Sequence, residues 1–179
     1  LSREHYPKQF LELFEKTLFQ NTLLRLDGLE ASVEISPPVI ICNEVHRFLV
    51  INQGSQISKT FETIILEPEG RNTAPALTVA ALHQNRNNND SIIIMMPADH
   101  IITEIDSFHM AVKAGIEMAN NDYLITFGIK PSQPETGYGY IQATNKIETC
   151  DDQEVFAIGG FTEKPNISLA KEYLDSGNY

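Results

Sequence analysis

The feature that most constrains the fold is a series of short apolar runs rich in β-branched residues. The runs are almost free of polar residues, whereas a strand with one solvated face alternates between the two kinds. Such runs suit strands that are buried on both faces of a mostly parallel sheet. They occur at residues 39–42, 64–66, 92–96, 123–127 and 155–158.

Patterns typical of helices separate these runs. They lie at residues 11–26, where an interruption is expected, and at 74–85, 108–119 and 168–174. Asp106 is a candidate N-cap for the third stretch, and Gly177 stands just past the end of the fourth. Because strand and helix alternate, we predict an α/β fold. Ligands of such sheets bind beyond the carboxyl ends of the strands, so the loops after the runs are the places to search.

Length and charge limit the function classes. The chain has 179 residues, which predicts one domain over residues 1–179. Lys and Arg total 13 against 24 Asp and Glu, giving a net charge of −11 and arguing against nucleic-acid binding. A small anionic substrate remains compatible with a few convergent cations.

Apolar runs and cysteines bear on the compartment. The apolar runs are far shorter than the ~20 residues that a membrane span needs, so no membrane partner is expected. No signal peptide is recognised at the start of the sequence. The two cysteines lack metal-ligand spacing, which predicts a reducing compartment, the cytoplasm.

The sharpest loop signal follows the run at 64–66 and reads EPEGRNTAPA. Gly70 permits tight backbone geometry in this loop. Asn72 or Thr73 is placed to cap the next helix, and the N-terminus of a helix favours anions. A simple strand-to-helix turn explains the same pattern equally well.

A second signal, Pro97-Ala98-Asp99-His100, follows the most apolar run. A carboxylate at the tip of a buried strand is a good position for Mg²⁺, which takes one or two protein carboxylates and bridges to substrate phosphates. Two alternatives stay open. In the first, Asp99 caps the following segment instead of binding a metal ion. In the second, His100 serves packing or hydrogen bonding rather than catalysis.

Glycines and charges mark two further loops. Gly137 and Gly139 flank Tyr138 and let the backbone approach a ligand closely. Lys164 offers a point charge for phosphate, and Glu163 offers an acceptor for a sugar hydroxyl. A glycine-bearing strand start and a solvated charge pair are the respective alternatives.

Taken in order, these segments resemble the bacterial mannose-1-phosphate guanylyltransferases. The opening LSREHYPKQF is similar to the second half of the sugar-nucleotidyltransferase signature, a glycine-rich loop ending in Pro-Lys. The motifs EPEGRNTAPA, PADH, TGYGYI and FTEKP follow in family order, so the resemblance covers essentially the whole chain. It implies a Rossmann-like three-layer fold. The implied reaction is that of GTP with mannose 1-phosphate, giving GDP-mannose and pyrophosphate with Mg²⁺.

The resemblance also implies residue roles. Lys8 is similar to the signature lysine that contacts phosphate, and Asp99 to the metal-binding aspartate, which makes both catalytic candidates. The residues implied for the sugar phosphate are Gly137, Tyr138, Gly139, Glu163, Lys164 and Asn178.

The family pattern extends past both ends of the sequence. The glycine-rich loop and its arginine are expected before Leu1, and a second metal-binding aspartate beyond Tyr179. We therefore expect a partial nucleotidyltransferase domain, truncated at both ends. The family includes a bifunctional type with a mannose-6-phosphate isomerase domain, and a homo-oligomer is compatible with the resemblance.

A hypothesis for base recognition follows from Glu67. Guanine presents two adjacent donors, its N1–H and 2-amino groups, and a carboxylate has acceptors only, so it can accept from both. The residues predicted to bind the nucleotide are Glu67, Arg71, Asn72 and Thr73. The alternative is that Glu67 pairs with a neighbouring cation.

Three other readings stay open. The first is a nucleotidyltransferase for another sugar or base, and the second is a non-catalytic nucleotide-binding fragment. The third, a dinucleotide-binding oxidoreductase, lacks a GxGxxG after a first strand.

Overall fold

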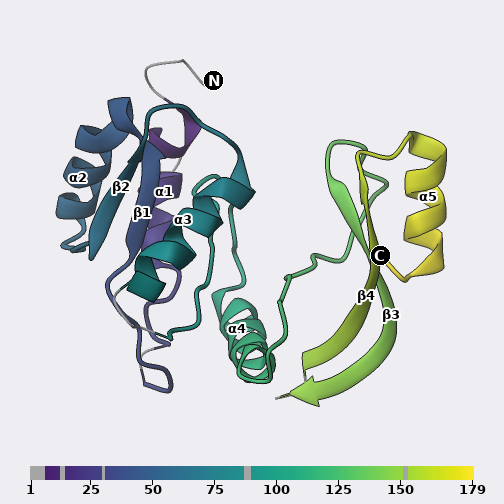
Figure 1. Cartoon of the computed structure of the whole chain (residues 1–179). Helices are drawn as coiled ribbons and strands as arrows, with labels where there is room; N and C mark the ends of the chain where they lie inside the picture. Colours follow the sequence, from purple (N-terminus) through teal and green to yellow (C-terminus); the bar gives the residue numbers. More distant parts are fainter. Residues whose placement is uncertain (1–6, 13–14, 30, 87–89, 151–152) are drawn as a thin grey trace. The chain divides into compact units, whose positions relative to one another are not determined.

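The computed structural model describes residues 7–12, 15–29, 31–86, 90–150 and 153–179. It divides into two compact units, Leu1–Ile105 and Asp106–Tyr179, and each is described by itself (Figure 1). Residues 1–6 of the opening motif lie outside the described residues. The assignment of residues 1–179 to one domain stays a prediction.

A parallel strand pair organises the first unit. Its elements are η1 (Lys8–Phe10), α1 (Leu18–Leu24), β1 (Val39–Asn43), η2 (Glu44–His46), α2 (Arg47–Gln56), β2 (Thr63–Glu67) and α3 (Thr73–Arg86). β1 and β2 pair in parallel, from Val39 opposite Thr63 to Asn43 opposite Glu67. The strands predicted at 39–42 and 64–66 and the helix predicted at 74–85 are confirmed.

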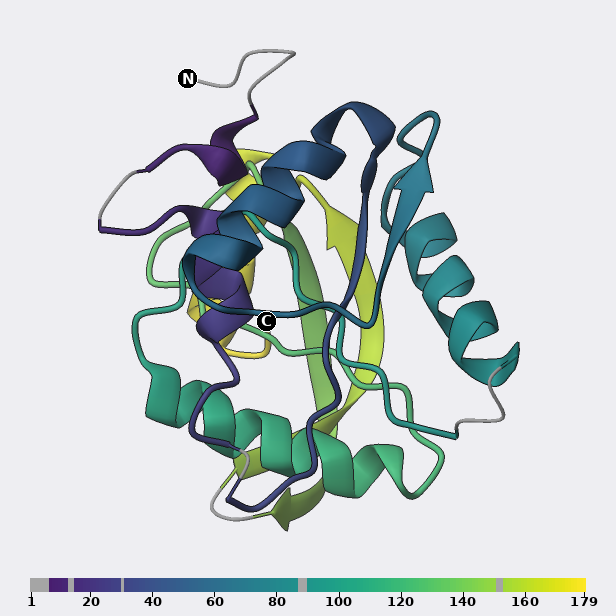
Figure 2. The ribbon, with the colours of Figure 1, turned by 90° about the vertical axis from the view of Figure 1, so that its left-hand side faces the viewer.

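The two faces of this strand pair contact different helices. Alternate strand residues, Ile40, Cys42 and Ile64, pack against the core of Phe10, Phe19 and Val50, which joins η1, α1 and α2. The intervening residues Ile41 and Ile65 instead share a cavity with Val79 of α3. Figure 2 shows α2 and α3 on opposite sides of the strands. The unit is therefore three-layered, as the resemblance implies.

Helix α1 is shorter than the pattern at 11–26 indicates, because it begins only at Leu18 and the described residues before it in this range are not helical. Thr17 is its N-cap and accepts from the Gln20 backbone N–H, while the Gln20 side chain accepts from the Thr17 N–H. This capping box satisfies two backbone donors that would otherwise be left without a partner at the start of the helix.

The second unit contains α4 (Ile105–Ala119), β3 (Gly139–Cys150), β4 (Gln153–Glu163) and α5 (Ile167–Ser176). Asp106 lies within the first turn of α4, so its assignment as N-cap is wrong. A carboxylate there still favours the helix, because the N-terminal end carries partial positive charge. Gly177 closes α5 with φ 68°, a left-handed conformation that favours glycine, and its predicted role is confirmed.

The strand predicted at 155–158 exists within β4 but pairs antiparallel with β3, so the expectation of a parallel strand is wrong there. Cys150 pairs with Gln153, and a connection this short permits only a hairpin, because parallel strands need a long crossover. Burial alternates along much of β4. Val155 packs against Ala114 and Met118 of α4, while Phe156 is 39% exposed.

The runs at 92–96 and 123–127 are not strands, although both are fully described. Several of their side chains are exposed, with Ile92 at 45% and Leu124 at 100%. An apolar run reports a tendency toward burial, but a strand also requires a hydrogen-bonded neighbour. The sequence pattern predicted burial, which these exposed side chains do not show, and it carries no information on strand pairing.

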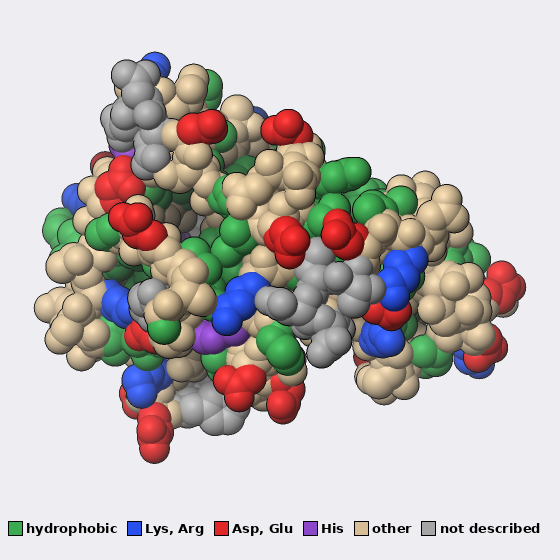
Figure 3. All heavy atoms as spheres, turned by 90° about the horizontal axis from the view of Figure 1, so that it is seen from below, with side chains coloured by type: hydrophobic (Ala, Val, Ile, Leu, Met, Phe, Trp, Pro, Cys, Tyr) green, Lys and Arg blue, Asp and Glu red, His purple; other side chains and the backbone are tan. Residues whose placement is uncertain are grey.

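Among the described residues, no helix combines the length and apolar character that a membrane crossing requires. Figure 3 shows acidic and basic side chains interspersed on the face seen from below, without a continuous basic patch among the side chains it colours. This distribution accords with the net charge of −11.

Candidate functional site

The structure brings together Lys8 and Asp99, the two catalytic candidates. Lys8 Nζ lies 2.7 Å from Asp99 Oδ2, and both side chains are partly exposed, at 53% and 38%. Lys8 lies in η1, and Asp99 follows the extended run at 92–96. Both residues belong to the first unit, so the contact lies within one compact part of the chain.

Electrostatics favour the ionised form of Asp99. The hydrogen bond from Lys8 is the largest cause that lowers its pKa from the ordinary value, and the charges of Lys8 and His100 add to the effect. Partial burial opposes this shift. His100 Nε2 lies 3.9 Å from Asp99 Oδ1, so the second carboxylate oxygen also has a nitrogen nearby. An ionised carboxylate within reach of solvent is available to a divalent cation.

The chemistry of Asp99 fits Mg²⁺ in one respect. No cluster of three or more His, Cys, Asp or Glu side chains occurs in the described part of the chain, so an all-protein cage is absent there. Mg²⁺ does not need such a cage, because it commonly keeps waters and binds through one or two carboxylates plus substrate phosphates.

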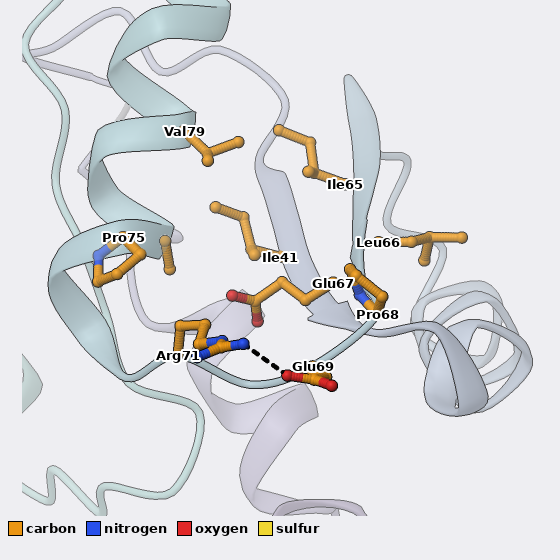
Figure 4. Close-up of a pocket in the computed structure, with 10 residues that line it drawn as sticks. Ile41, Ile65, Leu66, Glu67, Pro68, Glu69, Arg71, Pro75 and Val79 are labelled. Atoms are coloured by element: carbon orange, nitrogen blue, oxygen red, sulfur yellow. Dashed lines mark hydrogen bonds and ion pairs between the residues drawn. The ribbon is translucent and has the colours of Figure 1, made fainter.

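The loop after β2 opens onto a cavity of about 470 Å³, here called the Glu67 pocket. Ile41, Ile65 and Val79 form its apolar wall, and Glu67 and Arg71 supply polar groups. Figure 4 shows the Glu67 carboxylate directed into the space between the strands and α3. Pockets that bind small molecules are typically mostly apolar with a few placed polar groups, and ~300–1,000 Å³ in volume.

The predicted nucleotide residues lie around this loop in different ways. Arg71 Nη2 is 2.7 Å from Glu69 Oε2, so the ion pair of Arg71 is with Glu69 rather than Glu67. Asn72 adopts φ 65°, and α3 begins at Thr73. Both adjoin the pocket in sequence but are not among its lining residues. The amino end of a helix of 14 residues therefore follows directly after the pocket loop.

Both groups of residues belong to the same end of the first unit. Figure 2 shows η1 and the carboxyl ends of β1 and β2 toward the top of the view. This is the end of a parallel sheet at which α/β proteins bind ligands.

In the second unit the β3–β4 pairing brings five predicted sugar-phosphate residues together. Gly139 pairs with Glu163, and the Lys164 N–H donates to the Tyr138 carbonyl over 3.2 Å. Lys164 Nζ lies 3.3 Å from Glu163 Oε1, and both side chains are well exposed, at 64% and 73%. A Cβ at Gly139 would come 2.9 Å from Glu163 Oε2, and one at Gly137 would meet open space.

Asn178 follows α5 and lies beside β3. Its carbonyl accepts from the Ala143 N–H over 2.8 Å, and its own N–H donates to Ser176 Oγ over 3.3 Å. These backbone contacts attach the segment after α5 to β3, four residues past Gly139. Its predicted contact with sugar phosphate stays a prediction.

Sequence reasoning missed a set of buried polar residues next to Lys8 and Asp99. Arg25 is 4% exposed and donates through Nη2 to the His100 carbonyl over 2.8 Å. Gln53 is 5% exposed and donates through Nε2 to the Phe10 carbonyl over 3.0 Å. One signal was readable, because Thr17 and Gln20 stand at capping-box spacing.

A family model described as "Nucleotidyl transferase" matches residues 1–179. The chain belongs to this family. The resemblance to nucleotidyltransferases drawn from the motifs is thereby confirmed over residues 1–179.

Several curated relatives of this nucleotidyl transferase chain are named mannose-1-phosphate guanylyltransferase. Mannose-1-phosphate guanylyltransferase of Klebsiella pneumoniae is 47% identical over 180 residues, covering 100% of this chain and 37% of that protein. That of Escherichia coli strain K12 is 46% identical over 182 residues, with coverages of 100% and 37%. Xanthan biosynthesis protein XanB of Xanthomonas campestris is 44% identical over 180 residues, with coverages of 100% and 36%. The chain thus spans 36–37% of the length of these relatives.

Solved structures support the fold. A crystal structure described as mannose-6-phosphate isomerase from Helicobacter pylori has TM-score 0.79 and 32% identity, covering 99% of this chain and 64% of that one. One described as mannose-1-phosphate geranyltransferase from Thermus thermophilus has TM-score 0.81 and 30% identity, covering 99% and 49%. The predicted α/β nucleotidyltransferase class is confirmed.

Proposed function

We propose that the protein transfers a guanylyl group from GTP to mannose 1-phosphate, producing GDP-mannose and pyrophosphate. The observation that carries the proposal is the Lys8–Asp99 pair, 2.7 Å apart in a chain whose relatives at 46–47% identity are named mannose-1-phosphate guanylyltransferase. A cation and an ionised carboxylate are the groups that this chemistry needs. We further propose the cytoplasm as its location and a homo-oligomer as a compatible assembly.

The reaction is an in-line displacement. A phosphate oxygen of mannose 1-phosphate forms a bond to the α-phosphorus of GTP, and the bond from that phosphorus to the oxygen bridging to the β-phosphate breaks. Pyrophosphate leaves with the electron pair. Since no covalent enzyme intermediate is required, positioning and charge neutralisation supply most of the rate enhancement.

Different residues of this chain bind the triphosphate, the metal ion, the base and the sugar phosphate in this proposal. Lys8 neutralises phosphate charge, and Asp99 is the carboxylate that would hold Mg²⁺. When bound, Mg²⁺ supplies charge stabilisation at the triphosphate. Glu67 accepts from the guanine N1–H and 2-amino groups at the mouth of an apolar pocket that suits a planar base. Lys164 and Glu163 bind the phosphate and a hydroxyl of the sugar phosphate.

The test is an assay of pyrophosphate release with the full-length protein. GTP and mannose 1-phosphate with Mg²⁺ are the expected substrates, and UTP, ATP, CTP, dTTP and glucose 1-phosphate are the comparison panel. Preference for another base or sugar would replace the proposed substrates. Binding of GDP-mannose with no turnover of any pair would point to a non-catalytic nucleotide-sugar-binding protein.

A further inference from the structure

We propose that helix α1 and its flanking residues fix the geometry between Lys8 and Asp99, with Arg25 and Gln53 as positioning residues. The inference rests on the proposed function, because it assigns these two residues to the support of that reaction. Each of the two contacts the backbone near one member of the Lys8–Asp99 pair.

Arg25 acts on the Asp99 side. It follows α1 as the C-cap residue and is 4% exposed, and burial lowers the pKa of its guanidinium. Its Nη2 donates to the His100 carbonyl over 2.8 Å and to Thr22 Oγ1 over 3.1 Å. Thr22 Oγ1 donates in turn to the Leu18 carbonyl over 3.0 Å, so the guanidinium is anchored on α1. The His100 carbonyl, next to Asp99, is therefore held by one nitrogen of a planar guanidinium that is anchored on α1.

Burying a guanidinium at the end of a helix is unfavourable by itself. Desolvating a charge costs free energy that hydrogen bonds must offset. An exposed Lys or Arg can cap the end of a helix without this desolvation cost. Holding the turn that carries Asp99 accounts for placing the charge here.

Gln53 acts on the Lys8 side. This α2 residue is 5% exposed, and its Nε2 donates to the Phe10 carbonyl over 3.0 Å at the end of η1. Thr17 Oγ1 donates to Gln53 Oε1 over 2.7 Å, and Gln20 Nε2 donates to the Gln53 carbonyl over 3.1 Å. The same capping box that starts α1 therefore locks the amide that holds η1, the element bearing Lys8.

Both anchors converge on α1, and this has a mechanical consequence. The Lys8 and Asp99 side chains are 53% and 38% exposed, and exposed ion pairs hold their geometry weakly by themselves. The buried contacts fix the two backbones instead. Some residues orient a metal-binding side chain without contacting the metal. Replacing them commonly lowers metal affinity or activity about 10- to 100-fold.

The test compares Arg25→Gln and Arg25→Lys with a matched control, Arg47→Gln, in the full-length protein. Arg47 is an arginine of α2 that donates to the Glu44 carbonyl and lies over the Phe48 ring. The measurements are the Mn²⁺ affinity of the GTP complex, kcat, KM for both substrates, and amide hydrogen exchange over residues 97–102 without ligand.

We expect Arg25→Gln to weaken Mn²⁺ binding and lower kcat about 10- to 100-fold while KM for mannose 1-phosphate stays unchanged. Exchange at residues 97–102 should accelerate. Arg25→Lys should give intermediate values, because an ammonium keeps a donor for the His100 carbonyl but lacks the planar guanidinium with its fixed donor directions. Arg47→Gln should match the wild type. If Arg25→Gln fails to fold, the Arg25→Lys values decide the outcome.

A cycle with Asp99→Asn separates positioning from general stability. In the Asp99→Asn background, Arg25→Gln should weaken Mn²⁺ binding no further, although it still lowers Tm. Equal loss of Mn²⁺ affinity in both backgrounds, or unchanged exchange and affinity in both Arg25 variants, would overturn the proposal. A wild type without turnover would instead refute the proposed function, and the exchange data would still show whether Arg25 holds the turn.

Discussion

Glu67 carries the base specificity of the proposed reaction. Replacing it by Gln keeps the shape but puts a donor where an acceptor is needed, so one guanine donor loses its partner. Leaving a buried polar group unsatisfied costs about 1–3 kcal/mol. We expect Glu67→Gln to lower the ratio of kcat/KM for GTP over UTP by a corresponding factor, measured by pyrophosphate release.

A carboxylate directly after the neighbouring strand provides the control. Glu44 follows β1 as Glu67 ends β2, but it pairs with Arg47 and does not line the Glu67 pocket. Glu44→Gln should leave the GTP-over-UTP ratio unchanged. An unchanged ratio in Glu67→Gln would remove the assignment of guanine recognition to this residue.

The Lys8–Asp99 pair predicts a pH dependence of stability. The pKa of Asp99 is lowered in the folded state, chiefly by the Lys8 hydrogen bond, so the pair stabilises the fold above the unfolded pKa of about 3.9. The contribution is lost as the pH falls through the lowered folded pKa. Because both side chains are partly exposed, it should amount to about 0–1 kcal/mol.

The measurement is Tm against pH for wild type and Asp99→Asn. The wild type should be slightly more stable at pH 7, and the difference should vanish in acid once the Asp99 carboxyl is protonated. In a Lys8→Gln background, Asp99→Asn should no longer lower Tm at pH 7. A wild-type advantage that persists unchanged below the folded pKa would contradict this account.

Individual site residues differed in how far the sequence could predict them. Lys8 and Asp99 stand in recognisable motifs, which marked both as catalytic candidates, and the structure brings them into contact. Arg25 and Gln53 gave no such signal, because an arginine or glutamine in a helical pattern usually reads as a solvated residue. Their burial depends on which backbone carbonyls the tertiary structure brings beside them, and that information is not local in sequence.

Helix α2 contains a glycine whose role is set by packing. A Cβ on Gly54 would come 2.9 Å from Phe61 Cε2 and closer still to Cζ. Alanine usually stabilises a helix interior relative to glycine, by about 1 kcal/mol. Overpacking a well-packed core costs about 1–3 kcal/mol, and Phe61 packs against the core cluster of this unit, so the clash should outweigh the gain in propensity.

Thermal unfolding of Gly54→Ala should therefore show a lower Tm than the wild type. Ser55→Ala is the matched control, since Ser55 is the next residue of α2 and is exposed. That control should be neutral or slightly stabilising. A Gly54→Ala protein more stable than the wild type would mean that the Phe61 ring moves aside at little cost. This contact would then not determine the position at which α2 packs.

At the level of elements, the local sequence predicted the end of a helix better than it predicted which apolar runs form strands. The end of α5 at Gly177 was predicted because a left-handed residue favours glycine whatever the tertiary context. The run at 123–127 was not a strand, although it is as apolar as β1. Pairing depends on a partner from elsewhere in the chain, which an apolar pattern cannot specify.

For the whole molecule, alternation of elements sufficed to predict the α/β class but not its division into two units. The predicted nucleotide residues Glu67 and Arg71 lie in the first unit, together with Lys8 and Asp99. The predicted sugar-phosphate residues, including Lys164, lie in the second. No linker composition marks the boundary near Ile105, since α4 begins there directly.

This division predicts that a substitution at the predicted site of one unit changes KM for one substrate and not for the other. Lys164 is 64% exposed and pairs with Glu163 at 3.3 Å, so removing its charge should cost the fold little. Lys164→Ala should raise KM for mannose 1-phosphate and leave KM for GTP and the Tm close to wild type. The matched control is Lys171→Ala in α5, an exposed lysine of the same unit outside the predicted site, which should change neither KM. An equal rise of both KM values in Lys164→Ala would mean that the second unit also binds the nucleotide, and the assignment of one substrate to each unit would then fail.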